Sequence, residues 1–493
     1  MVDIYDVFGY YFTMSKKYIT TTLPYVNAEP HIGYAMEVVR ADVWARWQRT
    51  QGNEVFFNLG VDEHGLKIYQ RAKELGLGPQ AYCDQQAVKW QELSQTLNLS
   101  EHNFIRTTDA HHIKAVQEFW RQAKKNGFIY KKNYQARYCV GCELAKTESE
   151  LVDGCCPLHP KQALQIIEEE NYFFKFSEFQ QPLLELYEKN PEFVVPAHRF
   201  NEIKSFVKAG LQDFSVSRLK EKMPWGIEAP GDSEQVIYVW FDALINYISA
   251  IGWPDDTERF NSYWPAIQVA GKDNLRQQSA MWQAMLLAVK LPPSKQVFIN
   301  GFLTSNGQKM SKSLGNVIAP QELTDKFGAD GARYLLASLN TFGDDMDVTL
   351  AALTEKYNAE LANGLGNLVS RVLKLAENYS STELRRNVEA SGEVLDFART
   401  INDFMSAMNF SGAIEKIKAK IDWANKYIDD TKLWDLVKSD KDKARKVLAE
   451  LLGAIIAIGE ALAPVMPETS KKILDRARVN KIEKGEGLFL RVK

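Results

Sequence analysis

The chain has 493 residues, of which 45% are hydrophobic and 25% charged, with 29 glycines and 17 prolines. This composition excludes a disordered, collagen-like or small disulfide-stapled protein, and at about 100–200 residues per domain the length predicts two to four domains. Sixty Lys and Arg against 63 Asp and Glu give a formal charge of −3, which excludes a polycation that coats nucleic acid through bulk charge. No stretch of about 18 apolar residues is present to span a membrane, so no membrane partner is expected.

The first part of the chain alternates strands and a helix. Residues 1–13 lack the features of a signal peptide, and we expect an N-terminal extension over 1–17, with Met14 as a natural start. Residues 18–23 predict a strand, 24–30 a loop broken by two prolines, 32–51 a helix and 54–59 a second strand. Strand, helix and strand within about forty residues indicate a parallel, doubly wound sheet.

The same alternation returns later, with strands predicted over 236–240, 267–270 and 297–303 and a helix over 281–289. We therefore predict an α/β, Rossmann-like sheet split into halves 18–127 and 233–317, with a connective insertion over 128–232. After about residue 350 amphipathic helical patterns replace the strands. Residues 351–493 thus predict an all-α helix bundle, reached through a connecting region over 318–350.

Four of the five cysteines lie between positions 139 and 156. Such clustering is typical of a metal site in a reducing compartment, and we expect a cytoplasmic protein. Cys139-x-x-Cys142 and Cys156-x-x-His159 have the spacing of a closed tetrahedral Cys₃His site, whereas Cys155 is one residue off it. The pattern predicts one structural Zn²⁺ in the insertion; the alternative is a thiol cluster without metal.

Two motifs have the chemistry of a polyphosphate site. His31-Ile32-Gly33-Tyr34 stands where the first helix begins, and a helix N-terminus offers free N–H groups and a positive dipole end. The segment 309–313, Lys-Met-Ser-Lys-Ser, follows the last strand and supplies cations and hydroxyls. Each alone also fits a blander interpretation, helix capping or a solvated basic loop. Their pairing on the loop side of one split sheet favours a ligand site.

These motifs resemble the HIGH and KMSKS signatures of class I aminoacyl-tRNA synthetases, and their surroundings resemble the methionyl-tRNA synthetase family. The segments that carry this resemblance, in the family's order, are LPYVNAEPHIG, ADVWARWQRTQGNEVFF, GVDEHGLKI, YVWFDALINY, GKDNL and GFLTSNGQKMSKSLGN. The resemblance runs from about Tyr18 to about Lys472. It implies activation of L-methionine by ATP with Mg²⁺ to methionyl-adenylate, release of pyrophosphate, and transfer to the 3′ end of tRNA(Met), initiator tRNA included, for translation initiation and elongation.

The resemblance also implies an active site. His31, Gly33, Tyr34 and Asp273 would hold ATP, and Lys312, helped by Lys309, would stabilise the pentavalent phosphate as the methionine carboxylate attacks. Asp62 would pair with the substrate ammonium. The methionine pocket would be formed by Leu23, Tyr25, Trp240, Ala243, Tyr247 and Gln278. Aromatic walls suit a polarisable thioether, although without the flanking match Trp240, Ala243 and Tyr247 would be interpreted as ordinary core residues.

Three positions depart from the family pattern. Tyr34 replaces the second His of HIGH, Gln278 replaces a pocket His, and Asn274 replaces an apolar residue. Tyr can still donate one hydrogen bond to ATP, and Gln can still bind the pocket Tyr, so we interpret these as variation. They also prompt an alternative, a tRNA-binding protein without catalysis. A further alternative, a nucleotidylyltransferase for a small molecule, would have no use for so large a bundle.

In the predicted bundle, Asn367 and Arg371 lie four residues apart and so share a helix face. The resemblance implies that they read the anticodon and that Trp434 stacks on an anticodon base, with Leu433 where the family has proline. By spacing alone they are a surface amide, a solvated arginine and a bundle-core tryptophan. The chain lacks the β-rich C-terminal appendage that dimerises some relatives, so we expect a monomer.

Overall fold

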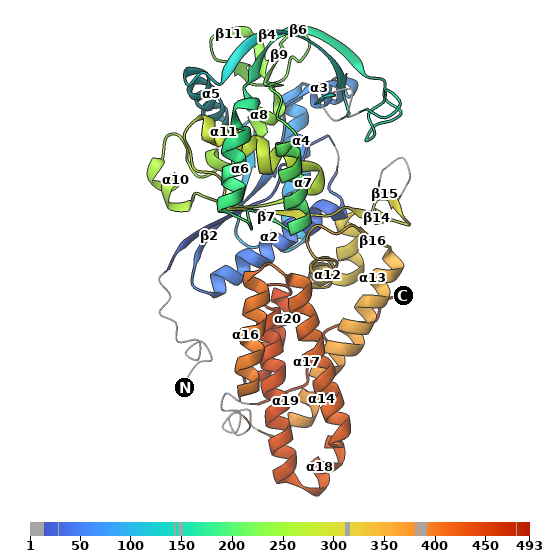
Figure 1. The fold of residues 1–493 in the computed structure, drawn as a ribbon. Coiled ribbons are helices and arrows are strands. Elements are labelled where there is room, and N and C mark those ends of the chain that lie inside the picture. Colours follow the sequence, from blue (N-terminus) through green and yellow to red (C-terminus); the bar gives the residue numbers. More distant parts are fainter. Residues whose placement is uncertain are drawn as a thin grey trace.

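A computed structural model describes residues 14–27, 29–141, 144–146, 151–310, 316–379, 384, 392–479 and 481–493. Most of the expected N-terminal extension, together with Cys142 and Lys312, lies outside the described residues, as does the side chain of Lys309. Figure 1 shows an α/β part, with the insertion at its upper end, and a long helix bundle that extends away below it. The expected α/β fold followed by an all-α bundle is confirmed.

The centre of the α/β part is a six-stranded sheet in the order β3-β2-β1-β12-β13-β7, with every neighbouring pair parallel. Its strands are β1 (Lys16–Thr20), β2 (Glu54–Val61), β3 (Asn103–Arg106), β7 (Val194–Val195), β12 (Ile267–Gly271) and β13 (Gln296–Asn300). Strand β1 lies between the two halves, because Ile19 pairs with Phe57 on one side and with Ile267 on the other. The strand order therefore reverses between β1 and β12, where open α/β sheets bind ligands.

Helices cover this sheet. They are α2 (Ile32–Thr50), α3 (Leu66–Glu74), α4 (Pro79–Thr96), α5 (Ala110–Lys125), α6 (Gln180–Lys189), α7 (Ala197–Lys208), α8 (Val239–Ala243), α9 (Asn246–Ser249), α10 (Thr257–Tyr263), α11 (Trp282–Ala288) and α12 (Pro320–Ala337). Helix α2 is buried without interruption from Tyr34 to Ala45, since it packs on the sheet and also against α12 and α16. A helix enclosed on all sides has little amphipathic pattern.

Two small sheets, formed mainly by the insertion, lie at the upper end in Figure 1. The predicted range 128–232 also contains β7, which pairs with β13 in the central sheet. One contains β4 (Ile129–Cys139), β5 (Leu144–Lys146), β6 (Gln165–Phe174) and β8 (Phe214–Ser215). The other contains β9 (Ser217–Leu219), β10 (Glu228–Ala229) and β11 (Asp232–Ile237). The strand predicted over 236–240 is wrong, because β11 ends at Ile237 and Trp240 belongs to α8. A short apolar run does not distinguish a strand from a buried helix.

The strand predicted over 297–303 is interrupted at Gly301. A Cβ at this position would lie 2.0 Å from the carbonyl oxygen of Asp344, so only glycine allows the two backbones to approach. The chain then enters a third small sheet of β14 (Leu303–Ser305), β15 (Gln308–Lys309) and β16 (Met346–Asp347). Its β14–β15 turn is Asn306-Gly307, with φ of 54° and 71°, as a two-residue hairpin requires.

The bundle is built from amphipathic helices, as the sequence predicts. They are α13 (Leu350–Lys356), a π-helical segment over Tyr357–Gly366, α14 (Asn367–Ala376), α16 (Gly392–Ser406), α17 (Phe410–Asp430), α18 (Leu433–Ser439), α19 (Lys441–Leu462) and α20 (Pro467–Ala477). Helix α19 packs against α14, α16, α17, α18 and α20. Within the described ranges, no helix has both the length and the apolar character needed to cross a membrane.

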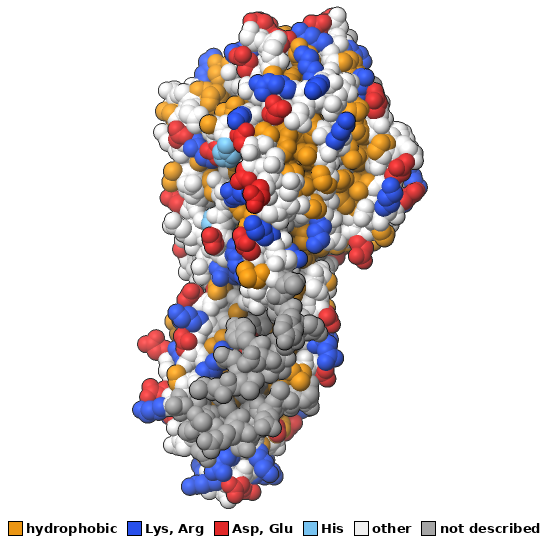
Figure 2. Space-filling model, turned by 90° about the vertical axis from the view of Figure 1, so that its left-hand side faces the viewer, with side chains coloured by type: hydrophobic (Ala, Val, Ile, Leu, Met, Phe, Trp, Pro, Cys, Tyr) orange, Lys and Arg blue, Asp and Glu red, His pale blue; other side chains and the backbone are white. Residues whose placement is uncertain are grey.

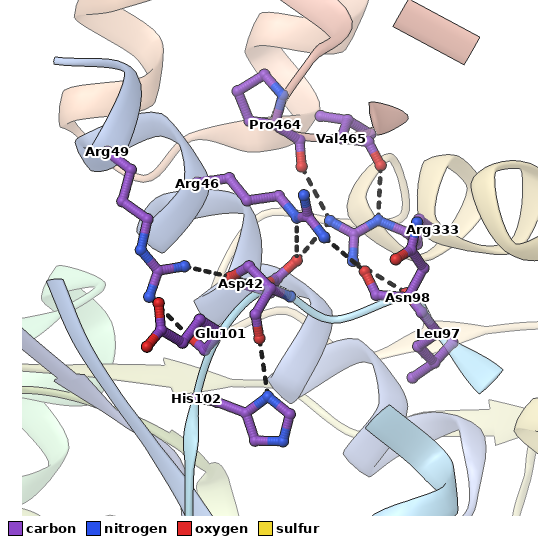
Figure 3. A network of polar contacts seen from close by, with 11 residues as sticks. Asp42, Arg46, Arg49, Leu97, Asn98, Glu101, His102, Arg333, Pro464 and Val465 are labelled. Atoms are coloured by element: carbon purple, nitrogen blue, oxygen red, sulfur yellow. Dashed lines mark hydrogen bonds and ion pairs between the residues drawn. The ribbon is translucent and has the colours of Figure 1, made fainter. Parts of the chain in front are cut away.

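A buried ionic network joins the bundle to the α/β part (Figure 3). Arg333 on α12 is fully buried and forms an ion pair of 2.7 Å with Asp42 on α2. Its guanidinium also donates to the carbonyl oxygens of Val465, at 2.8 Å, and Pro464, at 2.9 Å, in the turn between α19 and α20. Burial alone would raise the pKa of Asp42, but Arg333 and Arg46 hold it below its usual value. The junction therefore contains an ionised carboxylate between two arginines.

Candidate active site

The candidate site lies where β1 and β12 end side by side. After β1 the chain passes through Leu23 and Tyr25, which are half-buried, and then enters α2. Tyr25 forms a parallel bridge with Asp62 at the end of β2, with the Asp62 N–H donating to Pro24 O at 2.9 Å. After β12 the chain passes through Gly271 to the 3₁₀ turn that contains Asp273. The structure therefore brings Tyr25, Asp62 and Asp273, which follow three different strands, to one edge of the sheet.

His31 is the N-cap of α2. Its Nδ1 accepts the N–H of Gly33 at 3.1 Å, and its imidazole is exposed. Because Nδ1 is the acceptor, the neutral ring has its proton on Nε2. A Cβ on Gly33 would lie 3.0 Å from two atoms of this ring, so the glycine makes room for the cap. Capping and phosphate binding are thus compatible, with different nitrogens used for each.

Tyr34 points into the protein. Its ring packs edge-on against Trp90 at 5.3 Å, and its hydroxyl lies 3.5 Å from Thr21 Oγ1 and 3.4 Å from Thr22 O. Burial raises the pKa of Tyr34, so the phenol is neutral. The hydroxyl therefore lies at the end of β1, and its hydrogen bonds there are long.

Glu37, one turn further along α2, was missed by the sequence analysis. Its Oε1 accepts both the N–H and the hydroxyl of Thr22 at 2.7 Å. Burial raises its pKa to about 8, and the carboxylate of Asp273 adds to that rise. At neutral pH this side chain is therefore mainly the neutral acid. The sequence did contain a signal for it, since Glu37 is an acidic residue between apolar neighbours in the predicted helix.

Asp273 is exposed at the sheet edge, and its Oδ1 accepts from Asn274 Nδ2 at 3.3 Å. A Cβ on Gly271 would lie 2.6 Å from that oxygen, so a larger residue there would require the Asp273 side chain to turn away. The departure at Asn274 thus has a local effect, since this amide contacts the carboxylate that the sequence assigns to ATP.

Tyr247 and Gln278 are both buried and hydrogen-bonded to each other, as expected. Gln278 Nε2 donates to the Tyr247 hydroxyl at 2.7 Å, while its Oε1 accepts from Gln268 Nε2 at 3.1 Å. Gln268 therefore fixes the orientation of the Gln278 amide. Tyr18 on β1 donates to Tyr247 O at 2.8 Å and so ties α9 to the sheet.

Asp62 is only 4% exposed, and its Oδ1 accepts from the His64 N–H at 3.4 Å. The His64 ring binds Asp242 on α8, next to the predicted pocket residue Ala243. Trp240, on the same helix, has a buried Nε1 for which the described residues provide no acceptor. His64 and Asp242 occur in segments that carry the resemblance, but the sequence analysis gave neither a role.

Part of the second phosphate motif is described. Ser311 to Ser313 lie outside the described residues, while Lys309 ends β15. Asp347 supports the hairpin that leads to them, because its Oδ1 accepts from Gly307 N at 2.7 Å and Thr304 Oγ1 at 2.9 Å. The motif thus follows a hairpin with a hydrogen-bonded tip.

Three of the four predicted metal ligands are described, and they cluster. The ligand atoms of Cys139, Cys156 and His159 all lie within 4.8 Å of one another, and Cys139 Sγ is 3.7 Å from His159 Nδ1. Two ligands of a tetrahedral zinc, at about 2.3 Å for sulfur and 2.0–2.1 Å for nitrogen, are separated by roughly 3.6 Å. The donor set and this spacing fit a metal ion. A Cβ on Gly141 would lie 2.4 Å from the His159 ring, so glycine is required beside it.

The predicted anticodon residues lie on the surface of the bundle. Asn367 is exposed at the start of α14, and Arg371 pairs with Asp429 near the end of α17. Trp434 is 42% exposed on α18, whereas Leu433 is buried. The alternative of a bundle-core tryptophan is therefore wrong. Figure 2 shows Lys and Arg side chains together with acidic ones at the lower end of the bundle, the end that α18 occupies in Figure 1.

Comparisons with known proteins agree with this geometry. Residues 17–373 match the family model described as class I tRNA synthetases (M), and residues 379–486 match the anticodon binding domain of methionyl tRNA ligase. The methionine–tRNA ligase of Thermotoga maritima is 41% identical over 94% of this chain and 75% of its own length. That of Brucella suis is 40% identical over 93% of this chain and 91% of its own length.

Solved structures agree as well. The methionyl-tRNA synthetase of Mycobacterium tuberculosis in complex with methionyl-adenylate superposes with a TM-score of 0.89 and 34% identity, covering 97% of this chain and 100% of that one. Its apo form gives a TM-score of 0.84 at 31% identity, over 98% and 99% of the two chains. The split parallel sheet, with a capped helix end at its switch point, is thus that of a class I aminoacyl-tRNA synthetase. Within this class, the chain belongs to the methionyl-tRNA synthetase family.

Proposed function

We propose that this enzyme activates L-methionine with ATP to methionyl-adenylate, releases pyrophosphate, and transfers the methionyl group to the 3′ end of tRNA(Met), initiator tRNA included. The observation that carries the proposal is the meeting of the α2 N-terminus with Asp62 and Tyr247 around the adjoining ends of β1, β2 and β12. The family's adenylate complex from M. tuberculosis supports the same intermediate.

The chemistry needs placement and charge stabilisation rather than a covalent enzyme intermediate, because the methionine carboxylate is itself the nucleophile. His31 would donate from Nε2 to a phosphate oxygen while Nδ1 caps the helix. Gly33 would allow a phosphate close to the helix end, and Asp273 would bind ATP. Lys312, with Lys309, would stabilise the charge that develops on the pentavalent phosphate. Mg²⁺ would accompany ATP.

Methionine would be held at two ends. Asp62, nearly enclosed, would pair with the ammonium, where a low dielectric strengthens the attraction. Since the Tyr247 hydroxyl accepts from Gln278, its own proton can be donated to a weak acceptor such as a thioether sulfur. The remaining walls would be Leu23, Tyr25, Trp240 and Ala243.

Zn²⁺ would be held by Cys139, Cys142, Cys156 and His159 as a structural ion of the insertion. The close spacing of three of these ligands supports that role. At the other end of the molecule, Asn367, Arg371 and Trp434 would read the anticodon, which fits the exposure of the tryptophan side chain. We further propose a monomer that acts in the cytoplasm.

Amino-acid-dependent ATP–pyrophosphate exchange tests the function. We expect exchange with methionine and little with the other amino acids, and aminoacylation of tRNA(Met). Absence of exchange above the blank would favour the catalytically inactive tRNA-binding protein. Elemental analysis of the purified protein should find about one zinc per chain, and sedimentation should find one chain per particle.

Replacing Lys312 by Ala tests the phosphate site. The loss of a cation that acts on the transition state should lower the exchange rate by about 10²–10³-fold with little change in methionine binding. Lys326→Ala, on α12, is a matched control for the loss of one lysine. Equal losses in exchange and methionine affinity after the Lys312 change would contradict a transition-state role.

A further inference from the structure

A second buried carboxylate lies beside the methionine pocket. Asp242 on α8 is fully enclosed, two residues after Trp240 and one before Ala243. His64 Nδ1 lies 2.7 Å from its Oδ2, and His112 Nε2 lies 2.8 Å from its Oδ1. Each oxygen thus receives one imidazole N–H. Burial alone would raise the pKa of Asp242, but the two imidazoles hold it below its usual value, so the carboxylate is ionised.

His112 connects three helices. It lies on α5 and is fully buried, and its Nδ1 is 2.9 Å from Ser249 Oγ on α9 while Nε2 binds Asp242 on α8. Helix α9 also carries Tyr247. One imidazole ring therefore hydrogen-bonds α5 to both α8 and α9, in addition to the packing of Phe119 and Trp120 on Phe241 of α8.

His64 connects the same carboxylate to the predicted ammonium site. Its backbone N–H donates to Asp62 Oδ1 at 3.4 Å, and its ring binds Asp242. Trp225, from the insertion, contacts this ring at 5.5 Å between centroids, and its O accepts the N–H of Gly65 at 3.1 Å. One residue thus links Asp62 directly to the helix of Trp240 and Ala243.

We propose that Asp242, with His64 and His112 on its two oxygens, is a positioning centre for amino-acid binding by the activity proposed above. It fixes the helices that carry the side-chain walls at one distance from Asp62, so that the ammonium and the thioether are placed together. The three residues are positioning residues, because they act through Asp62, Trp240 and Tyr247. Removal of one imidazole leaves a buried charge with an unmet acceptor, which is costly.

The bonds of this cluster extend to the end of β2 and to α5, α8 and α9. The predicted ATP contacts are instead at the N-terminus of α2 and at the turn after β12. A defect in the cluster should therefore raise the KM for methionine and spare the KM for ATP. A merely structural cluster would change both together, or would change only the thermal midpoint.

The two histidines use different nitrogens, which gives a sharp test. The amide nitrogen of Asn lies near the place of Nδ1, and that of Gln near the place of Nε2. In ATP–pyrophosphate exchange, His64→Asn should retain a methionine KM within about 3-fold of wild type, whereas His64→Gln should raise it by about 10- to 100-fold. At the other position the order should reverse, because His112→Gln keeps a donor for Asp242 and loses only the contact with Ser249, whereas His112→Asn leaves one oxygen of the buried carboxylate without its donor. The ATP KM should change less than about 3-fold in all four variants.

The measured KM values and melting midpoints decide between support and rejection of the positioning role. The crossed Asn and Gln pattern, with melting midpoints matched within each pair, supports the proposal. Equal methionine KM values within both pairs, or parallel changes in the KM values for methionine and ATP, overturn it. Asp242→Asn, with His64 and His112 both retained, should raise the KM for methionine. An unchanged KM in this variant also overturns the proposal. Lack of methionine-dependent exchange by the wild type would instead contradict the proposed function.

Discussion

Asp42 and Asp242 are both fully buried carboxylates, yet their partners differ in kind. Asp42 contacts Arg333 at 2.7 Å and Arg46 at 2.8 Å, whereas Asp242 contacts two histidines. The guanidinium of arginine stays charged in proteins, and its five N–H groups can donate to several acceptors at once. Imidazole has two nitrogens with separate directions, so it can connect two groups through one ring.

The difference follows the location of each site. Asp42 lies at the joint between the α/β part and the bundle, where its ion pair with Arg333 holds the guanidinium that donates to Val465 O and Pro464 O of the bundle (Figure 3). Asp242 lies within the catalytic part, where small helices must be held at defined angles to Asp62. The comparison indicates that the first network contributes mainly stability and the second mainly binding geometry.

The largest expected effect on stability comes from the removal of Arg333, the buried partner of Asp42. Arg333→Met leaves Asp42 buried with one partner fewer, and the free energy of unfolding should fall by about 3–5 kcal/mol. Chemical denaturation measures this loss. The matched control is Arg46→Met, which removes a partner that is 20% exposed, so the loss should be smaller than that caused by Arg333→Met. Equal losses in the two variants would contradict the central place of Arg333.

A buried carboxyl group whose recorded partners, among the described residues, are all neutral extends the comparison. Glu37 is buried like the two aspartates, but its partners are the neutral groups of Thr22, and burial raises its pKa from 4.5 to about 8. Between these values the folded state retains a proton that the unfolded state loses. Stability therefore falls as the pH rises through this window, by at most about 1.4 kcal/mol per pH unit.

Glu37→Gln keeps an oxygen that can accept from Thr22 and removes the titration. The difference in melting temperature between this variant and the wild type should grow in the variant's favour from about pH 5 to about pH 8. Thermal melts over that range measure it. Curves that stay parallel would show that Glu37 ionises normally.

The smallest expected effect on stability comes from an exposed pair. Arg371 and Asp429 have side chains that are 27% and 59% exposed, so removal of either should change the free energy of unfolding by about 1 kcal/mol or less. Arg371→Ala should nevertheless raise the KM for tRNA by about 10-fold and leave ATP–pyrophosphate exchange unchanged. Aminoacylation kinetics measure this. Lys374→Ala, on the same helix, is the control, and an equal rise there would point to general charge attraction.

Much of the fold could be predicted, because local patterns specify it. The order of strand, helix and strand from β1 to β2 follows from the pattern of apolar residues and breakers, although the strand predicted over 18–23 is β1 over Lys16–Thr20 and so includes the last two residues of the expected extension. The segment 236–240 could not be assigned correctly, since its apolar residues are buried both at the end of β11 and in α8. The bundle was predictable from helical periodicity alone.

The parts of the site that could be predicted are those whose residues lie close together in the sequence. His31 with Gly33, and Cys156 with His159, lie close in sequence and meet in the structure. Asp242 and its histidines could not be found in this way, because 178 residues separate it from His64 and 130 from His112. Buried polar pairs that join distant segments leave no periodic signal.

Arg333 grips the bundle through main-chain oxygens of Pro464 and Val465 rather than through side chains. This contact depends on the course of the main chain between α19 and α20 and not on the side chains of that turn. Other contacts of the joint do depend on side chains, because Trp47 Nε1 on α2 donates to Asn402 Oδ1 on α16 at 3.2 Å. A homologous bundle recombined onto this catalytic part would therefore have to keep the course of the turn and the amide at position 402.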